Sequence, residues 1–243
     1  MNGRQVRDPE TPVRLEHDHI AVDDTPVRET SKIYLAMNKP RGVVTTAFDE
    51  EGRATVYDLL PATIAPADPR SKTPEATKSI STGWVSPVGR LDKASEGLLL
   101  FTNDSTWAAR ITDPDRHLEK RYHVQVDCVA EEDLLKRIGR GVRVDGEHLT
   151  VRAVRAVRAG RKNSWLEISL DEGRNRHIRR LLETLGVQVL RLVRVSIGSL
   201  ELGSLTKGAV RPLTEEEKLF IDKALDDGRV AGKHDGRVPR NVG

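Results

Sequence analysis

The chain has 243 residues, of which 37% are hydrophobic and 32% are charged, and its formal net charge is +3. This length fits one large or two small domains, and the lack of any run of about 18 apolar residues excludes a membrane-spanning helix. A single cysteine, Cys128, excludes a disulfide framework and a multi-cysteine metal site, and the polar first residues argue against a secretory signal, so we expect a cytoplasmic protein.

The first third of the chain predicts little regular structure. Residues 1–30 are a polar extension too short to bury a core. Residues 33–37 read as a strand, and Thr55 is a candidate cap for a short helix ending at Leu60. Residues 61–82 are rich in Pro, Ser, Thr, Ala and Lys without periodicity, which predicts a long mobile loop.

The middle of the chain alternates between predicted strands and helices. The continuous apolar run at 97–102 predicts a strand buried on both faces, and Asn103 or Asp104 is placed to cap the helix that follows it. Residues 122–126 alternate between apolar and polar, which is typical of a half-buried strand. Residues 131–138 predict a helix that Gly139 ends.

The last third completes the predicted fold. Its elements are a strand at 164–170, a helix at 176–185, one long strand at 187–200, a short helix from 217 to 225 and a basic, flexible tail at 226–243. Because strands and helices interleave irregularly and neighbouring strands can pair as hairpins, the fold class is α+β with a mixed, mainly antiparallel sheet flanked by helices and loops.

Positive charge is concentrated in one segment. Residues 151–194 contain eleven basic and four acidic residues, a net charge of +7, so the rest of the chain carries −4. Ten of the eleven are arginine, whose planar fork suits phosphates and base edges. The segment is either a solvated charged face or a site for a polyanion such as RNA or DNA.

Three short segments contain candidate functional residues. Asp92 precedes the buried strand at 97–102, where a carboxylate serves either as a nucleophile or base or simply as a turn residue. Tyr122 opens an alternating strand and is a base-stacking or a core residue. The helix at 176–185 has an apolar stripe of Ile178, Leu181, Leu182 and Leu185. A rotation of about 100° per residue places Arg179 on the flank of this stripe, where it either reaches a buried carboxylate or is a structural or solvent-facing arginine. Arg176 and Arg180 lie opposite the stripe.

Metal and cofactor signals are weak. His17 and His19 are close in sequence, but no carboxylate or further histidine accompanies them at a metal-ligand spacing. We therefore expect neither a metal ion nor a cofactor.

Six segments, taken together and in order, resemble the signatures of ribosomal RNA pseudouridine synthases of the RsuA type. They are residues 39–46, 89–104, 120–122, 172–180, 190–194 and 211–214, so the resemblance covers residues 33–217. It implies a pseudouridine synthase catalytic domain at 31–225 and an isomerase that detaches uracil from its ribose, rotates it and rejoins it through carbon 5.

The resemblance also implies roles for individual residues. Asp92 matches the catalytic aspartate, Tyr122 the aromatic residue that stacks on the target base, and Arg179 the basic partner of the aspartate. The residues expected to bind substrate are Arg90, Arg174, Arg176, Arg180, Leu192 and Arg194. His177 departs from the pattern, because many relatives carry Gln at this position.

The N-terminal region departs further from the family. Many relatives begin with an RNA-binding S4 domain, whereas residues 18–27 resemble only the last strands of one. We therefore expect a monomer that binds ribosomal RNA, in a ribosomal subunit or an assembly precursor, with 23S rRNA favoured over 16S. The alternatives are a non-catalytic RNA-binding factor of ribosome assembly and a DNA-binding regulator, the latter disfavoured because no helix-turn-helix is recognisable.

Overall fold

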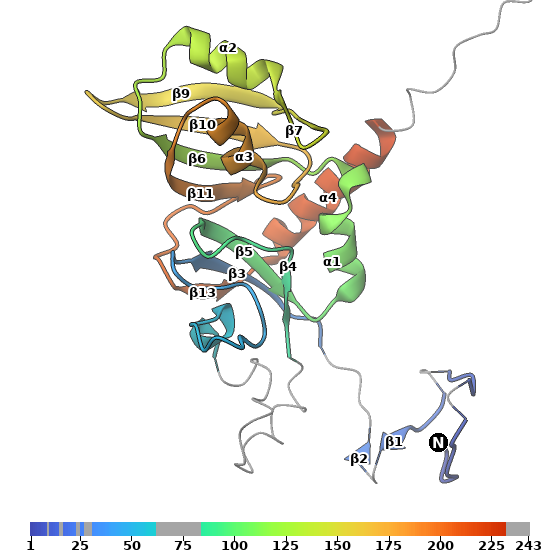
Figure 1. The fold of residues 1–243 in the computed structure, drawn as a ribbon. Coiled ribbons are helices and arrows are strands. Elements are labelled where there is room, and N and C mark those ends of the chain that lie inside the picture. Colours follow the sequence, from blue (N-terminus) through green and yellow to red (C-terminus); the bar gives the residue numbers. More distant parts are fainter. Residues whose placement is uncertain (9, 15–16, 23–24, 27–30, 62–83, 232–243) are drawn as a thin grey trace, which may run out of the picture. The chain divides into compact units, whose positions relative to one another are not determined.

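The computed structural model describes most of the chain. It covers residues 1–231 except 9, 15–16, 23–24, 27–30 and 62–83 (Figure 1). The predicted loop at 61–82 and the predicted tail at 226–243 therefore lie largely outside the described residues.

The chain divides into two compact units, Met1–Ser31 and Lys32–Gly243. In the first unit, β1 (Ala21–Val22) pairs with β2 (Thr25–Pro26) as a short antiparallel hairpin. The expectation that this region is a remnant of an RNA-binding module stays a prediction.

The second unit is built on a nine-stranded sheet. Its strand order is β13-β3-β5-β11-β6-β10-β9, with β4 also paired to β5 and β12 also paired to β11 (Figure 1). These strands are β3 (Tyr34–Lys39), β4 (Ser86–Val88), β5 (Glu96–Thr102), β6 (Lys120–Val126), β9 (Ala153–Ala159), β10 (Ser164–Leu170), β11 (Val189–Ile197), β12 (Leu200–Glu201) and β13 (Val210–Pro212). Only β5 and β11 pair in parallel within the described sheet, which confirms the mixed, mainly antiparallel α+β class.

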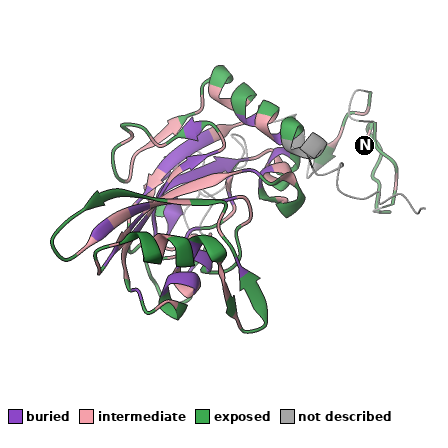
Figure 2. Cartoon of the chain, turned by 90° about the horizontal axis from the view of Figure 1, so that it is seen from above, coloured by how far each residue is buried: buried purple, intermediate pink, exposed green. Residues whose placement is uncertain are grey.

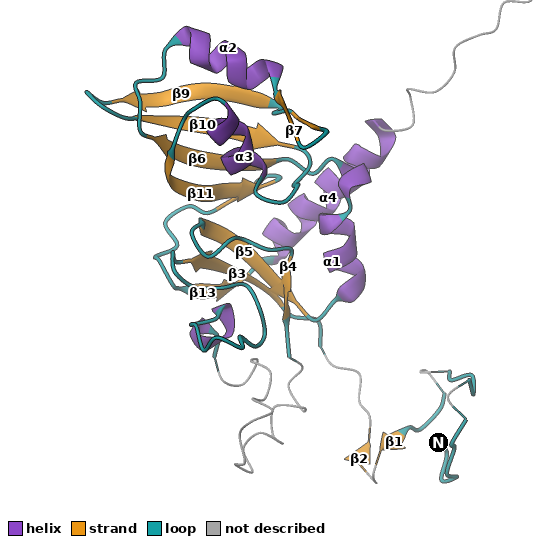
Figure 3. Cartoon of the chain, in the orientation of Figure 1, coloured by secondary structure: helices purple, strands orange, loops and turns teal. Residues whose placement is uncertain are grey.

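Helices and short turns of helix accompany the sheet (Figure 3). They are η1 (Val56–Leu59), α1 (Ser105–Thr112), η3 (Pro114–Arg116), α2 (Glu132–Arg140), α3 (His177–Thr184) and α4 (Glu215–Ala231). The hairpin of β7 (Val142–Val144) and β8 (Glu147–Leu149) connects α2 to β9. Within the described residues, none of these helices has the length and apolar character needed to cross a membrane.

Strand β5 is the centre of the core, as its continuous apolar run predicts. All seven of its residues are buried. Leu98 and Leu100 belong to the cluster formed with α1 and α4, whereas Leu99 and Phe101 belong to a second cluster that includes η1. A third cluster joins β6, β10 and β11 to α3. Figure 2 shows these buried residues gathered in the strands, with exposed residues on the outer helices.

Two predicted helix caps are confirmed. The Thr55 side chain accepts a hydrogen bond from the Tyr57 amide, and the Asp58 side chain accepts one from the Thr55 amide, which completes a capping box at η1. The Asp104 side chain accepts a hydrogen bond from the Trp107 amide at the start of α1. Asp104, rather than Asn103, is therefore the cap.

Three predicted element ends are wrong, for different reasons. Helix α2 continues through Gly139 and ends at Arg140; the next residue, Gly141, has a φ of +74°, which glycine adopts without strain. The strand predicted at 187–200 is interrupted after Ile197, where Gly198 has a φ of +56° and opens a turn into β12. Helix α4 extends past residue 225 to Ala231, and its Asp226 pairs with Arg110 of α1 at 2.6 Å.

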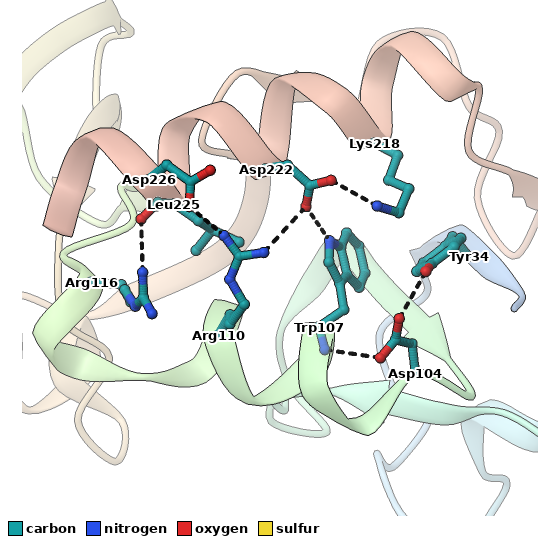
Figure 4. A network of polar contacts seen from close by, with 9 residues as sticks. All are labelled: Tyr34, Asp104, Trp107, Arg110, Arg116, Lys218, Asp222, Leu225 and Asp226. Atoms are coloured by element: carbon teal, nitrogen blue, oxygen red, sulfur yellow. Dashed lines mark hydrogen bonds and ion pairs between the residues drawn. The ribbon is translucent and has the colours of Figure 1, made fainter. Parts of the chain in front are cut away.

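A network of polar contacts attaches α4 to α1 (Figure 4). Asp222 accepts a hydrogen bond from Trp107 Nε1 at 2.9 Å and pairs with Lys218 at 2.7 Å. We expect Asp222→Ala to lower the free energy of unfolding by about 1–3 kcal/mol, because it leaves the N–H of a buried indole without a partner. Urea unfolding followed by tryptophan fluorescence measures this loss.

Asp226→Ala is the matched control. Its side chain is 71% exposed and pairs only with Arg110 among the described residues. The contribution of an exposed ion pair is about 0–1 kcal/mol, so this variant should unfold nearly as wild type does. If both substitutions had the same small effect, the indole hydrogen bond would not be what stabilises this contact.

Candidate active site

The β4–β5 loop carries Asp92, and contacts from the end of β3 and from the segment that follows β3 hold this loop in place. Lys39 is fully buried, and its Nζ donates hydrogen bonds to the carbonyl oxygens of Asp92 at 3.1 Å and Ser95 at 2.9 Å. The Thr45 hydroxyl donates to the Leu91 carbonyl at 2.8 Å. These contacts fix the backbone on both sides of Asp92 while leaving its carboxylate uncommitted.

This positioning role of Lys39 was not predicted from the sequence. Burial lowers the pKa of its ammonium to about 8, although the nearby carboxylates of Asp92 and Glu96 oppose the change. The only local signal is a lysine directly before a proline at the end of a buried strand. The hydrogen bonds that define its role join residues more than 50 positions apart, so they are known only from the structure.

Arg179 lies beside Asp92, as the resemblance implies. Its Nε is 3.9 Å from Asp92 Oδ2, which is an ion pair without a hydrogen bond, and its Nη2 donates to the Ala94 carbonyl at 3.0 Å. The Arg179 side chain is 13% exposed and that of Asp92 is 38% exposed. Burial lowers the pKa of Arg179, while the charge of Asp92 raises it. The buried cation of Arg179 therefore lies next to the more exposed carboxylate of Asp92.

A second carboxylate close to the loop is already committed. Glu96, the first residue of β5, is 3% exposed and pairs with Arg191 at 3.0 Å and Lys207 at 2.6 Å. These two cations hold its pKa below the usual value, although burial alone would raise it. Glu96 is therefore a structural ion-pair partner, and Asp92 is the carboxylate with a free edge.

Asp92 lines a pocket with a volume of about 560 Å³. Seven of the nine predicted site residues line this pocket: Arg90, Asp92, Tyr122, Arg174, Arg176, Leu192 and Arg194. They come from the β4–β5 loop, β6, the segment between β10 and α3, and β11. The pocket therefore brings together residues that are far apart in the sequence.

Arg179 and Arg180 do not line the pocket. Arg179 contacts the Asp92 loop from α3, as described above. Arg180 pairs with Glu147 at 2.7 Å and with Asp145 at 3.4 Å, on the β7–β8 hairpin. The sequence could not indicate these partners, and the expected contact of Arg180 with RNA stays a prediction.

Arg176 lies outside the helix in which it was predicted. It has a φ of +48°, in the left-handed region, and α3 begins one residue later at His177. The helical angle predicted for Arg176 is therefore wrong. Of the predicted apolar stripe, Ile178, Leu181 and Leu182 are buried, whereas Leu185 follows the end of α3 and is half-buried. Arg176 is exposed at the pocket entrance.

Tyr122 and Leu192 lie on adjacent strands. In the register of β6 with β11, Tyr122 is opposite Arg194 and Leu192 is opposite Val124. Tyr122 is half-buried and packs against two of the core clusters, while Leu192 is 7% exposed. The pocket thus offers a planar aromatic ring and an aliphatic side chain to a ligand.

The pocket lining is strongly cationic. It includes Arg90, Lys93, Lys120, Arg174, Arg176 and Arg194, and Asp92 is its one carboxylate among the described residues. In the same part of the chain, no three histidine, cysteine or acidic side chains are grouped as metal ligands would be. The arrangement suits a polyanionic ligand with one flat ring.

Comparisons with known proteins agree with this geometry. Residues 33–184 match the family model described as RNA pseudouridylate synthase. The chain is 36% identical over 192 residues to "Ribosomal large subunit pseudouridine synthase B" of Yersinia pestis, which covers 79% of this chain but 54% of that protein. It is 34% identical to an "Uncharacterized RNA pseudouridine synthase" of Aquifex aeolicus, over 93% of this chain and 84% of the relative.

A solved structure is also similar. It is described as "Crystal structure of pseudouridylate synthase", with a TM-score of 0.62, 29% identity, and coverage of 92% of this chain and 86% of that chain. The region that matches the family model, residues 33–184, includes the β4–β5 loop, β6 and α3, which carry Asp92, Tyr122 and Arg179.

Proposed function

The chain belongs to the RNA pseudouridylate synthase family, and we propose from this that it isomerises a uridine of large-subunit (23S) ribosomal RNA to pseudouridine, with Asp92 as the catalytic carboxylate. The observation that carries the proposal is the position of Asp92, at a cationic pocket and 3.9 Å from Arg179. The large-subunit substrate follows from the names of relatives, one of them a Bacillus subtilis protein that is 31% identical over 88% of this chain.

Asp92 acts on the ribose. As a nucleophile it attacks C1′, and as a base it takes a proton from C2′; both routes need the ionised carboxylate. Arg179, with its Nε 3.9 Å from Asp92 Oδ2, places a positive charge beside the reacting carboxylate. Lys39 contributes indirectly, by fixing the backbone that carries Asp92.

Tyr122 and the exposed arginines bind the substrate. A uridine must leave its base stack before an enzyme reaches its glycosidic bond, and an aromatic face holds the extruded ring. Arg90, Arg174 and Arg176 are exposed around the pocket, where they contact the phosphates on either side of the target.

Substitutions of two arginines separate chemistry from binding. Arg179→Ala should slow the single-turnover rate by about 100-fold, because it removes the cation beside Asp92, with little change in RNA affinity. Arg176→Ala should weaken RNA binding about two- to fivefold and reduce its salt dependence, with little change in rate at saturating protein. Filter binding at several salt concentrations and single-turnover assays measure both effects.

Equal effects of the two variants on rate and affinity would contradict these assignments. Melting temperatures control for folding, because Arg179 also donates to the Ala94 carbonyl.

The function itself is tested in cells. Pseudouridines in 23S and 16S rRNA are mapped with the gene present, deleted and restored. We expect one 23S position to lose its pseudouridine on deletion and to regain it on complementation. A loss confined to 16S rRNA would overturn the substrate assignment. Unchanged pseudouridines together with a defect in subunit assembly would favour a non-catalytic RNA-binding factor.

A further inference from the structure

The cations of the pocket differ in exposure. Arg90, Lys93, Arg174 and Arg176 are exposed, and we call them the rim cations. Lys120 and Arg194 are set deeper: Lys120 is half-buried, and Arg194 is 6% exposed. We call these two the inner cations. The rim cations suit phosphates that stay in solvent, but the inner cations need another explanation.

Arg194 has little to balance its charge. Its Nε donates to the Leu98 carbonyl at 2.7 Å, and its Nη2 is buried with no hydrogen-bond partner in the described part of the chain. No carboxylate of those residues forms an ion pair with it. Burying a guanidinium in this way is costly unless a ligand supplies the missing charge.

Lys120 shares this environment. It lies two residues before Tyr122 on β6, so both side chains project from the same face of the strand. Tyr122 in turn is opposite Arg194 on β11. The ammonium group of Lys120 makes no hydrogen bond or ion pair with any described residue. Burial and, to a smaller extent, the positive charge of Arg194 lower the pKa of Lys120 to about 8, although the negative charge of Asp171 opposes this change.

During the proposed isomerisation, negative charge develops on the uracil ring that stacks on Tyr122. When the N1–C1′ bond breaks, its electron pair stays on uracil, and the charge spreads over N1, O2 and O4. The C5–C1′ bond then forms, C5 gives up its proton and N1 takes one, so the product is an isomer of the substrate. A cation close to the ring oxygens lowers the barrier, since the charge develops only in the transition state.

We propose that Lys120 and Arg194 contact the oxygens of the detached uracil and stabilise its negative charge. This inference rests on the proposed function and extends it to the leaving group. We assign the uracil ring, and not a phosphate, as the ligand of the inner cations, because these cations lie on the strands that carry Tyr122 and Leu192. The exposed rim cations are the ones proposed to contact the phosphates of the RNA.

The test uses Lys120→Met, because Lys120 has no partner among the described residues whose loss would disturb the fold. On 23S transcripts labelled with 5-tritiated uridine, the single-turnover rate of tritium release should fall about 100-fold. RNA affinity should change less than about threefold, since phosphate contacts dominate it. Lys120→Arg, which keeps the charge, should recover most of the rate.

A second substrate separates charge stabilisation from a structural role. In 5-fluorouridine transcripts the fluorine withdraws electrons and stabilises the uracil anion, so bond cleavage depends less on the inner cations. The loss of 5-fluorouridine, followed by mass spectrometry of digested RNA, should show a much smaller deficit for Lys120→Met than tritium release does. An equal deficit on both substrates would overturn the proposal, as would a wild-type rate for Lys120→Met.

Two controls keep the result interpretable. Lys136→Met removes an exposed lysine of α2 that pairs with Glu132, and it should leave both rates unchanged. Wild-type protein is assayed beside each variant. If wild type releases no tritium, the proposed function fails; if wild type is active and Lys120→Met is equally active, only the role of the inner cations fails.

Discussion

Asp92→Asn is expected to abolish turnover while leaving RNA binding nearly intact. The substitution keeps the shape of the side chain but removes the charge that, in the proposed mechanism, attacks or deprotonates the ribose. We expect the single-turnover rate of tritium release to fall by at least about 1,000-fold, because Glu96, the other carboxylate nearby, is held by Arg191 and Lys207 and cannot replace it. RNA affinity should change by less than about threefold, as the phosphate contacts come from other residues.

Asp133→Asn provides the matched control for this substitution. Asp133 is exposed in the first turn of α2 and has no ion-pair partner among the described residues, so its variant should turn over as wild type does. Thermal melts establish that Asp92→Asn is folded. A folded Asp92→Asn protein that releases tritium at the wild-type rate would show that Asp92 is only a turn residue.

Gly97→Ala is expected to cause the largest loss of stability. Gly97 has a φ of +103°, and a Cβ at this position would lie 2.2 Å from the carbonyl oxygen of Arg194. The two residues are paired across the parallel contact between β5 and β11. Because backbone atoms cannot move aside as a flexible side chain can, the strands must separate, and we expect a loss of at least about 4 kcal/mol in the free energy of unfolding.

Gly146→Ala separates the steric contact from the backbone strain. Gly146 lies in the β7–β8 turn with a φ of +82°, and a Cβ there would meet no atom within 4 Å. Strain alone should lower the free energy of unfolding by about 1–2 kcal/mol. Urea unfolding of both variants tests the difference. Equal losses would mean that the approach of β5 to β11 is not restricted to glycine.

Local structure was predictable where neighbouring residues decide it. The caps at Thr55 and Asp104 follow from side chains that bond to amides two or three residues away. Strand β5 was predictable from its continuous apolar run alone, because a strand that is buried on both faces has apolar residues at successive positions. These features depend on short stretches of chain, which the sequence displays directly.

Features set by distant residues were not predictable in the same way. The contact of Asp226 in α4 with Arg110 in α1 joins two distant segments, and the partners of Arg180 come from the β7–β8 hairpin. The strand order, with β5 beside β11, joins segments about a hundred residues apart. A periodicity analysis contains no information about such contacts.

Some residues of the candidate site were predictable from the sequence, and others were not. Asp92, Tyr122 and Arg179 were identified by their resemblance to family signatures, and the structure brings them to one pocket and its edge. The positioning role of Lys39 and the unbalanced charge of Arg194 were missed, since each depends on burial and on partners across the sheet. The resemblance predicts the roles of Asp92, Tyr122 and Arg179, and the fold shows which residues surround them.

Direct detection of the product is the most direct test of the central claim. Purified wild-type protein and Asp92→Asn are incubated separately with 23S transcripts, 16S transcripts and ribosomal subunits, and the RNA is digested to nucleosides for chromatography and mass spectrometry. Pseudouridine should appear in stoichiometric amount in 23S RNA treated with wild type and be absent with Asp92→Asn. A wild-type protein that binds these RNAs tightly but forms no pseudouridine in any of them would contradict the claim.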